Sequence, residues 1–231
     1  MDGYKFITQL KAFMKQKTAI ILGATGLTGS LLAKRLITDG SYTSVKLFSR
    51  KTSGIRSPKV KEFLGDILQL EDFKKDFTAD EVYCCVGTTS AKTRDREVYR
   101  AIDFGIPFKA ATLAKENKIP TFMVISSMGA NAQSKIFYSR TKGEMEQAVL
   151  DQEIPNTYIL RPSLILGDRN ENRFGESFGA MVLKLTSALL VGRLKKYRAI
   201  KADQIAAAMI SLAKSLPDMK ILESDLIQEL A

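Results

Sequence analysis

The sequence contains no histidine and only two cysteines among its 231 residues. Without histidine, neither a Ser-His-Asp nor a Cys-His hydrolytic site can be assembled. Cysteine and histidine are also the usual ligands of structural zinc, so we expect no metal site. A catalytic proton must therefore come from a tyrosine, lysine, acidic or cysteine side chain.

The two cysteines, Cys84 and Cys85, are adjacent in the sequence. Neighbouring side chains of a strand point to opposite faces, so we expect no disulfide between them. We interpret both as small apolar core residues.

Long apolar runs are missing as well. Residues 180–191 come nearest to one, but Lys184 interrupts them and they fall short of the roughly 18 residues of a membrane span. We expect an amphipathic helix there. Residues 1–17 lack the apolar centre of a secretory signal and are interpreted as a helical extension. These features predict a cytoplasmic protein with no membrane span.

The formal net charge is +10, which suits nucleic acid, an anionic membrane surface or a phosphate-rich small molecule. The basic residues are spread along the chain, with denser stretches at 46–61 and 193–201. No nucleic-acid motif and no interleaving of basic and aromatic residues accompanies them. We expect no nucleic acid; the expected partner is a small-molecule substrate or another protein.

Strand-like and helix-like segments alternate along the chain, which predicts parallel pairing through right-handed crossovers. No linker or repeat divides the sequence. We therefore expect an α/β fold with a doubly wound, mainly parallel sheet, an NAD(P)-binding Rossmann fold, as one domain over residues 1–231 with a short substrate-side segment at 167–198. The expected strands are 18–22, 45–48, 60–64, 81–86, 122–125 and 157–160; the expected helices include 95–117, interrupted near Gly105 and Pro107, and 137–150.

A glycine motif follows the first expected strand directly, and a helix begins within it. Such glycines let the chain turn sharply and let a pyrophosphate approach the main chain, while the helix N-terminus offers unpaired N–H groups to the anion. No Gly-Lys-Ser/Thr closes the motif, so it is not a Walker A loop. We predict dinucleotide binding by Gly23, Thr25, Gly26, Leu27, Thr28 and Gly29.

The end of the second strand bears on which dinucleotide binds. NAD sites usually place an acidic residue there, whereas this sequence has Arg50 and Lys51. Both can pair with a 2′-phosphate, which favours NADPH over NADH; alternatively they are solvated loop charges.

Two further strand ends are expected to meet at the same edge of the sheet. After the third strand, Asp66 can accept a hydrogen bond from the adenine amino group or cap the following helix. After the fourth strand, Val86, Gly87 and Thr88 lie where the cofactor passes close to the backbone.

Tyr138 and Lys142 form a Y-x-x-x-K pattern inside an expected helix, so both side chains lie on one face. A nearby ammonium favours the tyrosinate and lets a phenol exchange protons nearer neutral pH. The fifth strand ends at Ser126 and Ser127, either of which can hydrogen-bond a substrate carbonyl. The predicted catalytic set is Tyr138, Lys142 and Ser127, with Ser126 as the alternative serine.

Taken together, these residues resemble the short-chain dehydrogenase/reductase superfamily, and within its atypical branch the Tat-interacting-protein-type oxidoreductases. The most specific segment is 168–176, DRNENRFGE, which is similar to that family's D-R-x-E-x-R-x-G-E. The motifs that carry the rest of the resemblance are 23–29, 49–51, 84–89, 126–130, 138–142 and 161–162.

The resemblance implies that NADPH contacts a defined set of residues and that Tyr138 gives or takes the proton. That set is Thr25 to Thr28, Arg50, Lys51, Val86, Gly87, Tyr138, Lys142, Ile165 and Arg173. The leading hypothesis is an NADPH-dependent reductase of a small carbonyl compound. The alternatives are a non-catalytic NADPH-binding protein that docks a partner, and an epimerase-like enzyme of nucleotide sugars, although residues 167–198 are short for gripping so bulky a substrate.

Overall fold

The structure is a computed structural model that describes residues 16–89, 93–167 and 192–231, without the side chain of Arg193. Its centre is a seven-stranded sheet of order β3-β2-β1-β4-β5-β6-β9, and all six strand pairs in it are parallel. This confirms the doubly wound Rossmann-type α/β fold. The strands are β1 (Lys17–Leu22), β2 (Tyr42–Ser49), β3 (Val60–Leu64), β4 (Glu81–Cys84), β5 (Thr121–Ile125), β6 (Asn156–Arg161) and β9 (Ile221–Glu223); a separate parallel pair joins β7 (Ile165–Leu166) to β8 (Ile200–Lys201).

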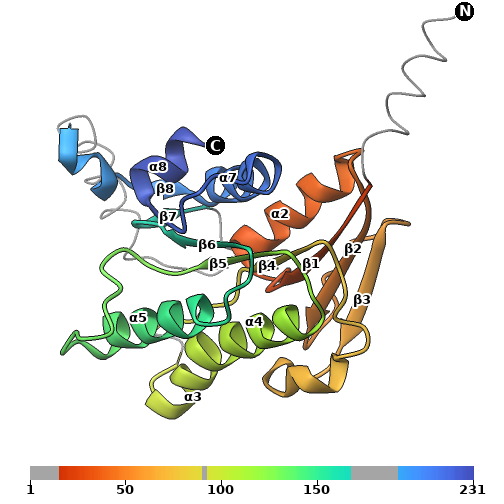
Figure 1. Cartoon of the computed structure of the whole chain (residues 1–231), viewed down its shortest axis with the longest axis horizontal. Helices are drawn as coiled ribbons and strands as arrows, with labels where there is room; N and C mark the ends of the chain where they lie inside the picture. The colour runs from red at the N-terminus through yellow and green to blue at the C-terminus, as the bar shows by residue number, and fades with distance from the viewer. Residues whose placement is uncertain (1–15, 90–92, 168–191) are drawn as a thin grey trace, which may run out of the picture.

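Helices cover both faces of the sheet (Figure 1), with α2, α7 and α8 on one side and α3, α4 and α5 on the other. The α-helices are α2 (Leu27–Thr38), α3 (Arg96–Arg100), α4 (Ile106–Glu116), α5 (Phe137–Leu150), α7 (Ala202–Ser215) and α8 (Ser224–Glu229). The other helical elements are the 3₁₀ helices η1 (Ile67–Phe73) and η3 (Gly192–Tyr197) and a π-helical turn, η2 (Ala101–Gly105).

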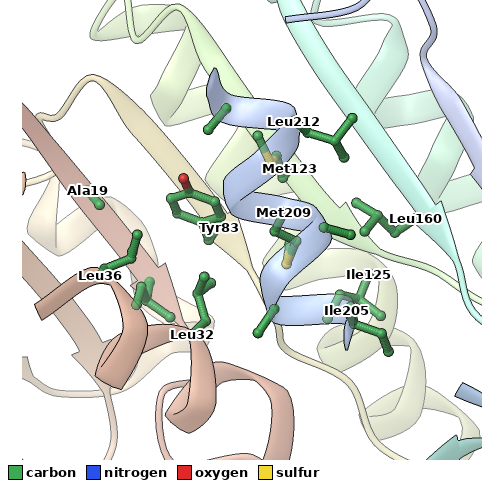
Figure 2. Packing of buried hydrophobic residues seen from close by; sticks show 14 of the residues in the cluster. Ala19, Leu32, Leu36, Tyr83, Met123, Ile125, Leu160, Ile205, Met209 and Leu212 are labelled. Atoms are coloured by element: carbon green, nitrogen blue, oxygen red, sulfur yellow. The ribbon is translucent and has the colours of Figure 1, made fainter. Parts of the chain in front are cut away.

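Each face of the sheet has its own hydrophobic cluster, as expected when a sheet is buried on both sides. Figure 2 shows the cluster beneath α7, where Ile205, Met209 and Leu212 pack toward Leu32 and Leu36 of α2 and the side chains of the sheet. On the opposite face, aromatic rings gather around Phe48, which stacks on Phe63 with 4.7 Å between ring centroids. The two clusters hold the central strands rigidly, so the loops at their ends have fixed starting points.

The strand order reverses between β1 and β4. From β1 the chain builds outward through β2 and β3, then returns to place β4 on the other side of β1. The two loops that leave the carboxyl ends of β1 and β4 therefore diverge and leave a crevice between them. Ligands of open α/β sheets bind at such a point.

The long helical segment between β4 and β5 is continuous, but its middle turn is π-helical. Ile106 N–H donates to Ala101 O, the wider spacing of a π turn. Pro107 explains it, because its ring has no N–H to give to the carbonyl of Asp103 and would clash with that carbonyl in a regular α-turn. The expected interruption near Gly105 and Pro107 is thus a widened turn rather than a break.

Several elements differ from the sequence-based expectation or lie beyond it. The sheet contains a further strand, β9, and the helices α7 and α8 pack beside the sheet. These three elements were not predicted from the sequence. The expected helix at 180–191 and most of the expected extensions at 1–17 and 167–198 lie outside the described residues. No helix in the described part of the chain is long and apolar enough to cross a membrane.

Candidate functional site

A cavity of about 590 Å³ opens at the carboxyl edge of the sheet, in the crevice between β1 and β4. Its walls come from the loop and helix after β1, the loop after β4, the end of β5, and α5. The lining residues are Thr25, Gly26, Leu27, Thr28, Ser30, Cys85, Val86, Gly87, Thr88, Thr89, Asp103, Ile125, Ser126, Tyr138, Lys142 and Ile165.

The glycine motif makes the turn from β1 into α2. Gly23 has φ +86° and its carbonyl accepts a hydrogen bond of 2.9 Å from Gly26 N. Gly29 faces this carbonyl so closely that a Cβ at position 29 would lie 2.2 Å from Gly23 O. Neither Gly23 nor Gly29 lines the cavity; they permit the tight turn that exposes the backbone of Thr25 to Thr28 to it.

The N-terminus of α2 points into the cavity without a side-chain cap. Its N-cap residue is Gly26, and no acidic residue occupies the first turn. The open N–H groups and the positive end of the helix dipole therefore remain available to an anion. With the close backbone approach at Gly29, these features fit the pyrophosphate of a dinucleotide.

Arg50 and Lys51 follow β2 and are exposed, at the same edge of the sheet as the cavity but not among its lining. The loop after them is held by Glu62 of β3, whose carboxylate accepts hydrogen bonds from Thr52 Oγ1 at 2.7 Å and from Ser53 N and Oγ at 2.7 and 2.6 Å. These bonds hold the pKa of Glu62 below its ordinary value. Arg50 and Lys51 therefore lie at the start of a loop that these hydrogen bonds hold in place.

Tyr138 and Lys142 both line the cavity from α5, as the Y-x-x-x-K spacing implies. The Lys142 ammonium is almost fully buried and forms an ion pair with Asp103 of the π turn, with 2.8 Å between Nζ and Oδ1. The pair is held by charge rather than by a well-aligned hydrogen bond. Lys142 Nζ also lies 3.5 Å from Ile125 O, a long hydrogen bond.

Of the two serines that end β5, Ser126 lines the cavity and Ser127 does not. Ser126 Oγ donates to Glu146 Oε1 at 2.5 Å, and Arg161 holds the same carboxylate through Nε at 3.0 Å and a second guanidinium nitrogen at 2.6 Å. Ser127 Oγ instead donates to Met128 O at 3.1 Å. The structure thus brings the alternative serine, Ser126, to the site.

Other predicted residues lie away from the cavity. Asp66 is exposed and caps η1 by accepting from Leu68 N at 3.0 Å, which is the second of the two roles expected of it. Arg173 lies outside the described residues. Cys84 is buried and Cys85 is half-buried at the cavity wall; both thiols are free, and burial raises the pKa of Cys84 to about 11, so it remains protonated at neutral pH.

Five lining residues were outside the predicted site: Ser30, Cys85, Thr89, Asp103 and Ile125. Ser30, Cys85, Thr89 and Ile125 are chain neighbours of residues that were predicted or named as alternatives, so wider margins around each motif would have found them. Asp103 had no such signal, because its place depends on the π turn and on how α4 packs beside α5.

Comparison with known proteins identifies the family. A profile of the NAD(P)H-binding family matches residues 23–180. The chain belongs to this family, in the atypical branch of the short-chain dehydrogenases/reductases. Among the proteins similar to this chain, "Protein FMP52, mitochondrial" of Candida albicans is 35% identical over 82% of this chain and 86% of its own length. "Protein HTATIP2" of Rattus norvegicus is 31% identical over 71% of this chain and 69% of its own length.

The fold of this NAD(P)H-binding chain is also that of solved epimerases. The UDP-glucuronic acid 4-epimerase of Bacillus cereus, solved with UDP-glucuronic acid and NAD, superposes with a TM-score of 0.67 at 16% identity, covering 90% of this chain and 77% of the epimerase. At that identity the likeness concerns the fold alone.

The relatives correct the predicted location. The proteins similar to this chain from Scheffersomyces stipitis, Candida albicans and Debaryomyces hansenii are all named mitochondrial, which contradicts the cytoplasmic prediction. The prediction was wrong because it tested only for an apolar secretory segment, whereas mitochondrial targeting segments are amphipathic and basic.

Proposed function

We propose that this chain is an NADPH-dependent oxidoreductase that reduces a small carbonyl compound to the alcohol. The observation that carries the proposal is the convergence of the uncapped α2 N-terminus with Tyr138 and Lys142 on one cavity. The anion site can hold the dinucleotide, and a phenol beside an ammonium can protonate the carbonyl oxygen during hydride transfer.

The dinucleotide, when bound, supplies the hydride. Thr25 to Thr28 hold its pyrophosphate through backbone N–H groups, and Lys142 donates hydrogen bonds to its ribose hydroxyls. Tyr138 gives its phenolic proton to the substrate oxygen as negative charge develops there. Ser126 Oγ, whose own proton is directed to Glu146, offers a lone pair that orients a hydroxyl group in the cavity.

The preference for NADPH rests on Arg50 and Lys51. A 2′-phosphate at the end of β2 would meet two cations and no acidic residue on the strand end itself. Charge-assisted hydrogen bonds to phosphate are about twice as strong as neutral ones, so these side chains favour the phosphorylated cofactor. The anchoring of the loop by Glu62 supports this role, because it limits the entropy lost when phosphate binds.

A thermal-shift titration with NADPH and NADH in parallel tests the proposal. A ligand that binds only the folded state raises the apparent stability with the logarithm of its concentration over Kd. We expect the shift with NADPH to exceed the shift with NADH. In Arg50→Ala the affinity for NADPH should fall about tenfold or more, since one charged contact is worth about 1.5–3 kcal/mol. No shift with either nucleotide, once co-purified cofactor has been removed, would sink the proposal.

Activity measurements on the same purified protein then distinguish a catalyst from a protein that only binds the dinucleotide. Over a panel of small aldehydes and ketones, Tyr138→Phe should lower kcat by about 100-fold or more while retaining most of the NADPH shift, because the ring is kept and only the hydroxyl that carries the transferable proton is lost. A protein that binds NADPH but turns over no carbonyl would instead be the non-catalytic partner-docking protein considered above.

A further inference from the structure

Asp103 is the one acidic residue among the described residues that line the cavity. We propose that it is the counter-ion and positioning residue of Lys142: it keeps the buried ammonium charged and holds it against the cavity wall, ready to meet the ribose hydroxyls of the dinucleotide. The inference rests on the proposed function for the identity of that ligand. The pairing itself can be tested without it.

The contacts place Lys142 between the ends of two strands. Its ammonium lies 2.8 Å from Asp103 Oδ1, and the side chains of Lys142 and Asp103 are 5% and 0% exposed. Asp103 Oδ2 accepts from Thr88 N at 2.8 Å, which fastens the carboxylate to the loop after β4. The pair also backs onto Gly87, where an added Cβ would lie 3.5 Å from Asp103 Oδ1 and 3.8 Å from Lys142 Nζ.

This arrangement leaves Lys142 with capacity for a ligand. An ammonium has three N–H donors. Asp103 Oδ1 faces the ammonium as an ion pair at 2.8 Å without a well-aligned hydrogen bond, and Ile125 O lies at a distant 3.5 Å, so the ammonium can still donate into the cavity that it lines. Asp103 thereby aims the ammonium while satisfying its charge.

Three other titratable groups near Lys142 do not serve as its counter-ion. Glu146, one turn further along α5, is already paired with Arg161, with 2.6 Å between Oε2 and a guanidinium nitrogen. Cys84 of β4 is buried, which raises the pKa of its thiol to about 11 and keeps it neutral. Burial, and next the Asp103 carboxylate, raise the pKa of Tyr99 of α3 well above its ordinary value, so it is neutral too. The ring of Tyr138 packs against that of Tyr99, with 6.2 Å between ring centroids. In the proposed function, Tyr138 is the proton donor that Lys142 assists.

The backbone gives a second, independent reason to regard Asp103 as specialised. It lies in the π turn, whose widened hydrogen-bond spacing follows from Pro107. Such turns are found frequently at functional sites because they redirect a side chain out of the regular helical register. Here the redirected side chain is the carboxylate that meets Lys142.

Asp103→Asn tests the charge with almost no change of shape. A buried ammonium that loses its carboxylate gives up its proton more readily, so NADPH binding should come to depend on pH. We expect the Kd for NADPH, measured by quenching or transfer of its fluorescence, to match the wild-type value within about twofold near pH 6 and to be weaker by about tenfold near pH 8.5, one charged hydrogen bond being worth about that factor. Asp203→Asn, which removes the carboxylate of the exposed pair with Arg35, is the matched control and should leave the Kd unchanged at both pH values.

A double-mutant cycle in thermal unfolding tests the pair without any cofactor. Lys142→Met leaves a buried carboxylate uncompensated and should lower Tm by about 10 °C, whereas Asp103→Asn combined with Lys142→Met should regain most of that loss. If Asp103→Asn alone fails to fold, the double variant still shows whether the two charges depend on each other.

The outcomes distinguish a failure of the proposed function from a failure of the inference about Asp103. A wild-type protein that binds no NADPH contradicts the proposed function, and the Tm cycle then decides the ion pair by itself. NADPH affinity in Asp103→Asn that follows the wild-type values at every pH, or Tm losses that simply add in the double variant, would overturn the inference.

Discussion

Ser126 and Ser127 show how a single residue step changes a side chain's role. Both follow β5, yet Ser126 faces the cavity and Glu146 while Ser127 donates to the backbone carbonyl of Met128. The sequence placed a serine at this strand end but could not choose between the two, because the alternation of faces stops being regular where a strand ends. Only the packing of α5, which brings Glu146 under β5, made the choice.

Substitution of each serine in turn tests this difference. We expect Ser126→Ala to lower kcat/KM for carbonyl reduction about tenfold or more, through loss of the acceptor that orients a hydroxyl group in the cavity, and Ser127→Ala to stay within about twofold. Steady-state kinetics at saturating NADPH, with circular dichroism as a check on folding, gives the comparison. A larger loss in Ser127→Ala would show that the serine outside the cavity is the functional one.

At the scale of elements, the clearest constraint is the contact between α5 and the loop before it. Gly143 follows Lys142 on α5, and a Cβ there would lie 2.1 Å from Ala132 N and 2.3 Å from Asn131 C. Backbone atoms cannot yield as a flexible side chain can. The close approach therefore sets how near α5 lies to the loop, and so where Tyr138 and Lys142 stand.

Gly143→Ala should therefore act against the usual trend. In an exposed helix the change stabilises by about 1 kcal/mol. Here the clash should destabilise by about 3 kcal/mol and lower Tm by about 6–12 °C. Gln147→Ala, at an exposed position of the same helix, is the control and should change stability by no more than about 0.5 kcal/mol. Scanning calorimetry of both variants measures these changes in stability. A Gly143→Ala variant more stable than the wild type would mean that the helix and the loop are not in contact.

At the scale of the whole molecule, tyrosines are buried in several layers of the fold. Burial raises the pKa of Tyr42 and Tyr83 above the ordinary 10.0, and the Glu81 carboxylate, which both hydroxyls contact, adds to the shift. Tyr99 and Tyr158 are shifted in the same direction, again mainly by burial. None of these phenols can ionise in the folded protein near its ordinary pKa.

Because folding raises the pKa of these tyrosines, the protein should unfold at alkaline pH. A group whose pKa is raised on folding contributes stability below its unfolded pKa, and this contribution is lost as pH rises above about 10. We expect the tyrosinate absorbance of the buried phenols to rise cooperatively, together with the loss of helical circular dichroism. A gradual titration of every tyrosine with the fold intact would contradict the prediction.

The sequence by itself determined the features that depend on near neighbours in the chain. The strand at 60–64 and the helix at 137–150 match β3 and α5 to the residue, the glycine turn lies where expected, and Tyr138 and Lys142 share a helix face. Hydrophobic period, turn geometry and i, i+4 spacing are local properties, so a linear pattern is enough to predict them.

Only the tertiary structure decided which distant residues meet. The pairing of Asp103 with Lys142, the choice of Ser126 and the addition of β9 beside β6 all depend on how separate elements pack on the sheet. Hydrophobic burial is non-directional and leaves such pairings open in the sequence. The tertiary structure fixes these pairings. Pro107 widens the π turn, Gly143 lets the loop before α5 approach that helix closely, and the two hydrophobic clusters pack against the sheet. Close-packed interiors then leave each side chain few positions.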